Sequence, residues 1–179
     1  MMGTMGATRR ADMFIDPDED PRENWPRLGD ERVTLLEYLR CQRLTLELKY
    51  AGLDAAQMAH RSVEPSTMSL LGLVRHMAEV ERRWFRVRLA GLDVPPHFYT
   101  DDDRDGDFDG AVPDPQVVAE AWGVWREECA YTDDIVASAP TLDVTAIDDQ
   151  GRAISLREVL GCPTRCNQAG RATTTMLSS

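Results

Sequence analysis

The side chains in this sequence that could bind a metal ion or transfer a proton include three histidines, and His76 is the most promising of them. It lies between Leu73 and Val80 at helical spacing, and so on the apolar inner face of a predicted helix. A neutral imidazole can bind Zn, Ni or Fe through one ring nitrogen while a carboxylate or carbonyl holds the other. Glu79, one turn further on, could hydrogen-bond the ring or pair with Arg83. His76 is therefore either a metal ligand or a core histidine, and for residue types alone the core histidine is the commoner case.

The other two histidines, His60 and His97, lie far from His76 in the sequence and pair with nothing nearby. No Ser-His-Asp arrangement can be assembled from them, so the sequence identifies no catalytic residue. The segment 97–99 could line the mouth of a pocket, but a surface loop is the default expectation for it.

An acidic segment at residues 101–109 has the spacing of the first half of a calcium-binding loop. Its aspartates are followed by Gly106 at the position where the sharp turn of such a loop requires glycine. The twelfth position is Val112, where a bidentate glutamate would be needed. We therefore expect a solvated acidic loop that does not bind calcium specifically.

Four cysteines fall into two groups. Cys41 and Cys129 lie within helical patterns and are expected to be reduced and buried. Cys162 and Cys166 form a C-x3-C pair that lacks the second half of a zinc site, so we interpret them as exposed thiols.

The length of 179 residues, the hydrophobic fraction of 42% and the net charge of −11 are typical of one acidic globular protein. This charge argues against nucleic acid or an anionic membrane surface as a partner. No stretch reaches the ~20 apolar residues of a membrane-spanning helix, and acidic residues occupy the place of a signal peptide's apolar core. We therefore expect a cytoplasmic protein that binds neither nucleic acid nor membrane.

Helical periodicity and capping residues predict three long helices. The first runs from Asp30 to a stop at Gly52, and the second from an N-cap at Ser66 to Gly91. The third begins at Asp114, which is followed by a proline at the first helical position.

A short strand pair is predicted next, at 142–147 and 153–154. Ser155 and Glu158 then form a capping box, which predicts the start of a fourth helix. Gly161 and Pro163 arrive within two turns, so this helix is cut short. The predicted fold is all-α, a four-helix bundle with a hairpin-like segment before a truncated last helix. We divide the chain into an extended or disordered arm (1–27), the bundle (28–160) and an aberrant, unstructured tail (161–179).

These residues resemble the DinB-like four-helix bundle superfamily, and within it the actinobacterial group of unknown function that includes the mini-circle protein. The most specific match is the run from Pro65 to His76. Others are Asp30-Glu31-Arg32, Glu79-Val80-Glu81-Arg82 with Trp84-Phe85, Asp107-Phe108-Asp109-Gly110, Trp125-Arg126-Glu127 and Ser155-Leu156-Arg157. The resemblance covers roughly residues 12–160.

The resemblance implies a three-histidine site for a divalent metal (Zn, Ni or Fe), with one ligand on the second helix and an H-x3-H pair on the fourth. Relatives include mycothiol- and bacillithiol-dependent transferases and isomerases, in which the metal activates a low-molecular-weight thiol toward a small-molecule substrate. Only His76 carries over as a ligand, because the H-x3-H pair is absent and His60 and His97 match neither position. The resemblance thus implies a metal-dependent thiol transferase or isomerase, impaired here by two missing ligands.

Two further hypotheses concern the end of the chain. When read two nucleotides into each codon, codons that encode residues 171–177 permit the string Arg-His-Asn-Asp-His-Ala, whose H-x2-H spacing is close to the family's H-x3-H pair. The tail is therefore interpreted as a frame-shifted form of the histidine-bearing helix. Alternatively, the chain is a non-catalytic, degenerate bundle with a structural role, forming a homodimer that covers the groove left by the missing helix.

Overall fold

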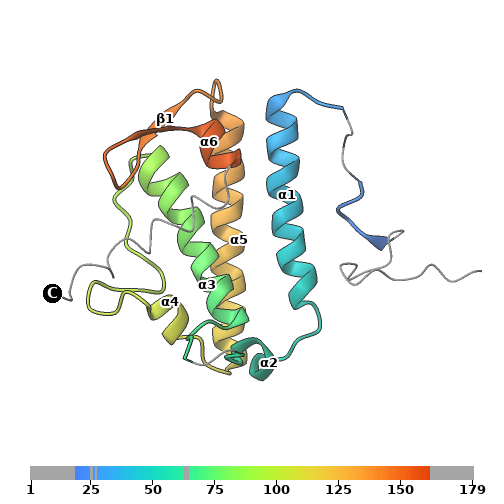
Figure 1. Ribbon diagram of the computed structural model, residues 1–179, viewed down its shortest axis with the longest axis vertical. Helices are drawn as coiled ribbons and strands as arrows, with labels where there is room; N and C mark the ends of the chain where they lie inside the picture. The colour runs from blue at the N-terminus through green and yellow to red at the C-terminus, as the bar shows by residue number, and fades with distance from the viewer. Residues whose placement is uncertain (1–18, 25, 27, 63–64, 162–179) are drawn as a thin grey trace, which may run out of the picture. The chain divides into compact units, whose positions relative to one another are not determined.

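The computed structural model describes residues 19–24, 26, 28–62 and 65–161. The chain divides into two units, Met1–Ala51 and Gly52–Ser179. The described residues are mainly helical with one two-stranded sheet (Figure 1), which confirms the all-α prediction. Residues 162–179 of the tail, with Cys162, Cys166 and the segment of the frame-shift hypothesis, lie outside the described residues, and the division into arm, bundle and tail stays a prediction. Among the described helices, none is long and apolar enough to cross a lipid bilayer.

The first unit contains helix α1 (Glu31–Tyr50), which begins where the sequence predicts. Its N-cap is Asp30, whose carboxylate accepts a hydrogen bond from the backbone N–H of Val33 at 2.9 Å. Preceding residues are held against the helix by Arg22, which binds the Asp20 carboxylate and donates to Thr45 Oγ1 at 3.0 Å. The hydrogen bond from Arg22 lowers the pKa of Asp20. Residues 20–22 are therefore anchored on α1 by a charged contact that helical periodicity does not reveal.

In the second unit, helix α3 (Leu70–Glu81) begins later than predicted. Its N-cap is Ser69, whose Oγ accepts from the N–H of Gly72 at 3.0 Å, whereas Ser66 Oγ accepts only from Met68 at 3.2 Å. The prediction of Ser66 as N-cap was wrong because residues 66–69 are not helical, and Ser69 forms an isolated β-bridge with Arg61. A serine three positions later meets the same capping requirement where the backbone first turns helical.

Helix α3 continues without a break into a π-helix, η2 (Arg82–Leu89), which the sequence did not predict. A π-helical turn is rare and often occurs at functional sites. The predicted stop at Gly91 is confirmed. This glycine has a φ of +67°, and the next N–H, that of Leu92, bonds back to the carbonyl of Arg86 at 2.9 Å.

Helix α5 (Pro115–Ser138) packs along α3 and provides the other half of the core (Figure 1). Its N-terminus confirms the prediction, since the Asp114 carboxylate accepts from the N–H of Gln116 at 2.8 Å and Pro115 occupies the first turn. The buried apolar side chains include Leu71, Val74 and Ala78 from α3, Trp84 and Phe85 from η2, and Ala121, Trp125, Cys129 and Val136 from α5.

The predicted hairpin and capping box are both present. Strands β1 (Thr145–Ile147) and β2 (Ala153–Ser155) pair antiparallel with Ala146 opposite Ile154. In the turn, the Asp148 carboxylate accepts hydrogen bonds from the backbone N–H and from the side chain of Arg152. These hydrogen bonds, the backbone one having the larger effect, lower the pKa of Asp148. Helix α6 (Leu156–Gly161) starts at the capping box: Ser155 N–H donates to Glu158 Oε2 at 3.0 Å, and Glu158 N–H donates to Ser155 Oγ at 3.3 Å.

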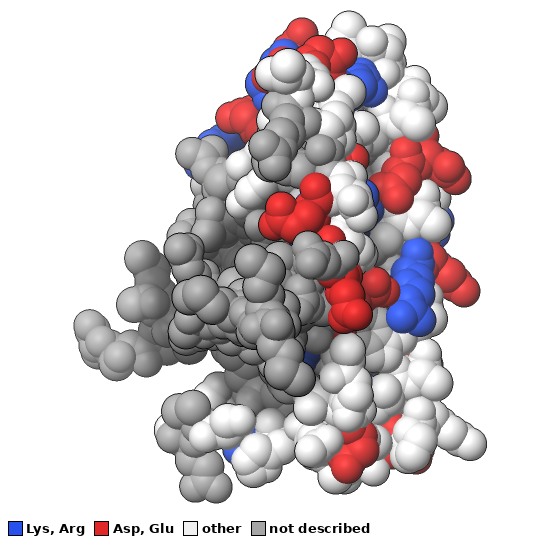
Figure 2. Space-filling model, turned by 90° about the vertical axis from the view of Figure 1, so that its right-hand side faces the viewer, with Lys and Arg blue, Asp and Glu red and all other residues white. Residues whose placement is uncertain are grey.

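Two short helices, α2 (Ala55–Ala59) and α4 (Gly106–Asp109), were not predicted because each is too brief to show helical periodicity. On the face shown in Figure 2, acidic side chains (red) recur along the described surface and basic ones (blue) are few, in keeping with the net charge of −11.

Candidate functional site

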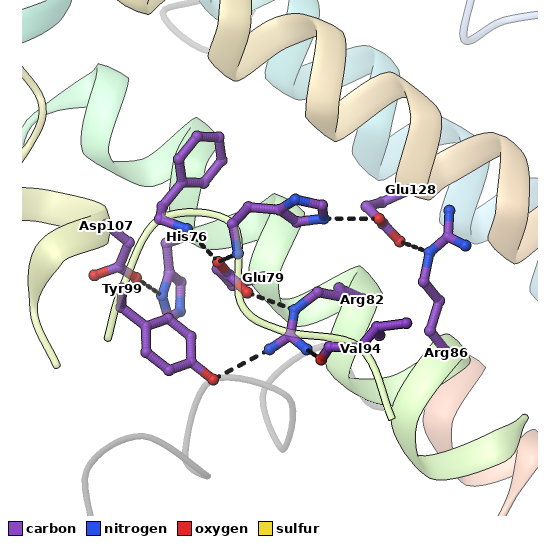
Figure 3. A network of polar contacts seen from close by, with 10 residues as sticks. His76, Glu79, Arg82, Arg86, Val94, Tyr99, Asp107 and Glu128 are labelled. Atoms are coloured by element: carbon purple, nitrogen blue, oxygen red, sulfur yellow. Dashed lines mark hydrogen bonds and ion pairs between the residues drawn. The ribbon is translucent and has the colours of Figure 1, made fainter. Parts of the chain in front are cut away.

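The central feature of the site is a hydrogen bond between His76 on α3 and Asp107 on α4. His76 Nδ1 lies 2.7 Å from Asp107 Oδ2, and the two side chains are 25% and 8% exposed, respectively (Figure 3). A carboxylate at this distance accepts the proton of Nδ1, so the neutral ring keeps its lone pair on Nε2. Among the described residues, no hydrogen-bond partner lies on Nε2. The geometry therefore leaves one ring nitrogen of a half-buried histidine available to a ligand.

Helix α4 can lie this close to His76 because α3 has a glycine one turn earlier. A Cβ atom on Gly72 would lie 2.7 Å from Phe108 Cδ1 and 3.2 Å from Phe108 Cα, too close for any side chain to fit without displacing α4. The Phe108 ring packs beside the imidazole, with ring centroids 5.2 Å apart. Contact between Gly72 and Phe108 thus determines how closely α4, which carries Asp107, packs against α3, which carries His76.

The prediction of a solvated acidic loop is wrong for Asp107. Residues 101–105 are exposed, as expected, but Asp107 is buried and is the partner of His76. The sequence did contain a signal, because Asp107 opens one of the segments that carry the family resemblance. The carboxylate that holds His76 therefore comes from α4, not from the helix that carries His76.

Glu79 takes neither of the two roles considered for it. Its Oε1 accepts from the backbone N–H groups of His97 (2.6 Å) and Phe98 (2.7 Å), and its Oε2 accepts from Arg82 Nε at 2.7 Å. Glu79 and Arg82 are each only 5% exposed at the side chain. A buried carboxylate needs several donors, and Glu79 finds them in the loop after η2 instead of in Arg83. Arg83 instead pairs with Asp149.

Arg82 extends this contact to the segment 94–99. Its Nη1 donates to the carbonyl of Val94 at 2.9 Å and its Nη2 to the hydroxyl of Tyr99 at 3.2 Å (Figure 3). Together with Glu79, it fixes both ends of a segment for which the sequence indicated only a surface loop. Phe98 within it is buried, whereas His97 is partly exposed.

A further buried carboxylate lies on α5. Glu128 accepts from Arg86 Nε at 2.7 Å and lies 2.9 Å from His97 Nε2, while the Arg86 guanidinium carbon stacks 3.8 Å from the Tyr131 ring centroid. His97 thus connects the loop to α5, and the network runs from α3 through the loop to α5 (Figure 3).

Cys129 on α5 is buried and unoxidised, as predicted, whereas Cys41 on α1 is only partly buried. The Cys129 Sγ lies 3.7 Å from Glu81 Oε1, and the other oxygen of Glu81 accepts from Thr132 Oγ1 at 2.6 Å. These contacts join α3 to α5 inside the core and lie in buried surroundings typical of a structural thiol.

The buried face of α3 differs from the predicted one. Leu73, His76 and Val80 are only partly buried, whereas Arg75 and Glu79 are buried with the apolar residues. Apolar periodicity missed this face because two of its members are charged. Their side chains hydrogen-bond to backbone groups of the segments 94–99 and 106–110.

The described residues do not by themselves form a metal centre. His76 has the form of a metal ligand, with one nitrogen held by a carboxylate and the other available. However, no group of three or more His, Cys, Asp and Glu side chains that could hold an ion occurs within the described part of the chain. A firmly bound transition metal needs such a group, so one histidine does not suffice.

Comparison with protein families gave a match over most of the chain. The family model described as mycothiol-S-transferase matches residues 34–162, a range that includes α3, α4, α5 and the His76–Asp107 pair. Comparisons with curated proteins and with solved structures returned no match.

Proposed function

Because the chain belongs to the mycothiol-S-transferase family, we propose that it has the framework of a metal-dependent, thiol-linked transferase or isomerase acting on a small molecule. His76 is the metal ligand that α3 contributes, and Asp107 orients it. The activity of the chain as written is impaired, because its sequence lacks the H-x3-H pair that would complete a three-histidine site.

The hydrogen bond of 2.7 Å between His76 Nδ1 and Asp107 Oδ2 carries this proposal. Histidines that bind metals almost always donate the proton of their other ring nitrogen to a carboxylate, carbonyl or water, which fixes the tautomer and the ring orientation. A core histidine would be expected to use both ring nitrogens within the protein. His76 uses only one among the described residues and is partly exposed, which favours a ligand role.

The first test compares metal binding by two forms of the full chain. One is the chain as written, and the other has residues 161–179 replaced by an apolar helix with an H-x3-H pair. Calorimetric titration with Zn²⁺, Ni²⁺ or Fe²⁺ should give one tight site in the restored form and weak binding in the chain as written. His76→Ala should abolish the tight site, while His60→Ala, a substitution of an exposed histidine, should leave it unchanged. No metal binding by the restored form would contradict the proposal.

Activity and gene structure provide two further tests. Transfer of a small electrophile to mycothiol should be detectable with the restored form, strongly reduced in the chain as written, and lost in His76→Ala. Sequencing the coding DNA from codon 155 past the stop codon tests the frame shift directly. A closed alternative frame, or one without histidines, would remove that explanation of the tail.

One observation favours the alternative of a non-catalytic helical protein: within the described residues, no group of three or more potential metal ligands surrounds His76. In that case the chain acts as a structural protein and forms a homodimer. Light scattering should then show a stable dimer, and a monomer would contradict this alternative. The cytoplasmic location and the lack of nucleic-acid binding stay predictions.

A further inference from the structure

Arg75, the residue before His76, is a buried arginine bound to the loop that carries Asp107. Its Nε donates to the carbonyl of Asp107 at 2.9 Å and its Nη2 to the carbonyl of Gly106 at 3.0 Å. Its guanidinium carbon lies 4.2 Å from the centroid of the Phe98 ring. A charged group is costly to bury, so this one is positioned by specific contacts with the loop.

The loop is shaped around this guanidinium. A Cβ atom on Gly110 would lie 2.5 Å from Arg75 Nη2 and 2.9 Å from the carbonyl oxygen of Gly106, so the close approach requires glycine. The carbonyl of Gly106 also accepts from the N–H of Gly110 at 3.0 Å, which closes the turn over the guanidinium. The guanidinium therefore lies against the carbonyl groups of the α4 turn and beside Gly110.

Consecutive residues of α3 thus hold the same aspartate at two points. Arg75 binds the backbone carbonyl of Asp107, and His76 binds its carboxylate. Successive residues on a helix point about 100° apart, so the two side chains reach Asp107 from different directions. Two contacts from one rigid helix restrict both the place and the rotation of the carboxylate.

We propose that Arg75 is a positioning residue that keeps the Asp107 carboxylate on His76 Nδ1, and so determines which ring nitrogen of His76 is free for a ligand. Without Arg75, the carbonyl of Asp107 loses its hydrogen bond from α3 and α4 can shift. The imidazole then loses the acceptor that selects the Nδ1–H tautomer. This role concerns the same site as the proposed function and rests on it for its consequence in catalysis.

The proposal is tested by the tautomer of His76 in the metal-free, full-length chain labelled with ¹⁵N-histidine. Nitrogen chemical shifts of the neutral ring should show the Nδ1–H form in the wild type. Arg75→Met, which keeps an unbranched apolar stem, should make the Nε2–H form the major one, as should the reference variant Asp107→Ala. Arg75→Lys, which keeps the charge but not the fork of donors, should restore the wild-type signature in part. Arg104→Met, which removes an exposed arginine from the same loop, should leave the tautomer unchanged.

A folded Arg75→Met variant that keeps the Nδ1–H form would overturn the proposal. If circular dichroism shows that Arg75→Met does not fold, the Gly110→Ala variant tests the proposal instead. Its methyl group would displace the guanidinium from the Asp107 carbonyl while Arg75 stays in the sequence. An unchanged tautomer in a folded Gly110→Ala variant would equally overturn it.

Metal affinity separates this inference from the proposed function. In the form with the restored histidine helix, Arg75→Met should weaken metal binding about 10-fold or more, within the ~10–100-fold range typical of groups that orient a ligand. If that form binds no metal, the proposed function fails while the tautomer comparison still tests Arg75. If it binds metal equally tightly with and without Arg75, the positioning role fails and the proposed function stands.

Discussion

Replacement of Glu79 by alanine should be among the most destabilising single substitutions in the second unit. The Glu79 carboxylate is 5% exposed and accepts three hydrogen bonds, from the backbone N–H groups of His97 and Phe98 and from Arg82. Glu79→Ala leaves a buried guanidinium without its counter-charge and two N–H groups without their acceptor. It also releases the loop whose Phe98 ring packs on Arg75.

The size of the effect follows from these contacts. Removing one partner of a buried ion pair costs about 3–5 kcal/mol. Each N–H left without an acceptor adds ~1–3 kcal/mol if it stays buried, but His97 is partly exposed and its N–H can reach water. The contributions are not additive, so we expect a loss of about 3–5 kcal/mol from a free energy of unfolding of ~5–15 kcal/mol. Glu79→Gln keeps an oxygen for the two N–H groups but also removes the counter-charge of Arg82, so it should cost about 3 kcal/mol, at the lower end of that range.

Equilibrium urea unfolding, followed by far-ultraviolet circular dichroism and tryptophan fluorescence, provides the assay. The midpoint should fall while the slope stays constant, which identifies a change in stability and not in the compactness of the unfolded state. The matched control is Glu127→Ala, at an exposed position on α5, which should change stability by no more than about 0.5 kcal/mol. A loss below about 1 kcal/mol in Glu79→Ala, with Glu127→Ala neutral, would show that the buried ion pair contributes little.

Gly110→Ala should destabilise the chain by about 1–3 kcal/mol, because its Cβ would collide with the buried guanidinium of Arg75. Gly123→Ala on α5 should stabilise the chain by ~0.5–1 kcal/mol, because its Cβ would meet no atom within 4 Å and alanine favours the helix. Thermal unfolding of the two variants measures the difference, and equal effects would refute the steric argument. Ser69→Ala should lower the free energy of unfolding by ~1 kcal/mol, because it removes the N-cap of α3, and Ser66→Ala should lower it by less than about 0.5 kcal/mol. Urea unfolding measures both values. A larger loss in Ser66→Ala than in Ser69→Ala would contradict Ser69 as the N-cap. Hydrogen bonds lower the pKa of Asp148, so they stabilise the hairpin above the ordinary aspartate pKa of about 3.9, and this stabilisation is lost as the pH falls through the lowered folded-state value. Amide protection in the turn should therefore fall under acid in the wild type but not in Asp148→Asn, and equal pH dependence in both would contradict the assignment.

Much of the helical framework could be predicted because its signals are local. Asp114 with Pro115, Ser155 with Glu158, and Gly91 each act within about four residues, by satisfying or ending the backbone hydrogen bonds of a helix terminus. The π-helical turn after α3 was not predictable in this way, since the apolar spacing of the segment also fits an ordinary α-helix.

The sequence by itself determined that the chain is helical, that His76 lies on a helix within the segment that resembles the DinB-like superfamily, and that the sequence contains no H-x3-H pair. The tertiary structure alone decided which carboxylate holds His76. Asp107 lies 31 positions away, and it reaches the imidazole because Gly72 allows the α4 turn to pack directly on α3. Local hydrogen bonding fixes where a helix begins and ends, whereas the pairing of buried charges depends on which loops pack against that helix, and sequence spacing does not record this.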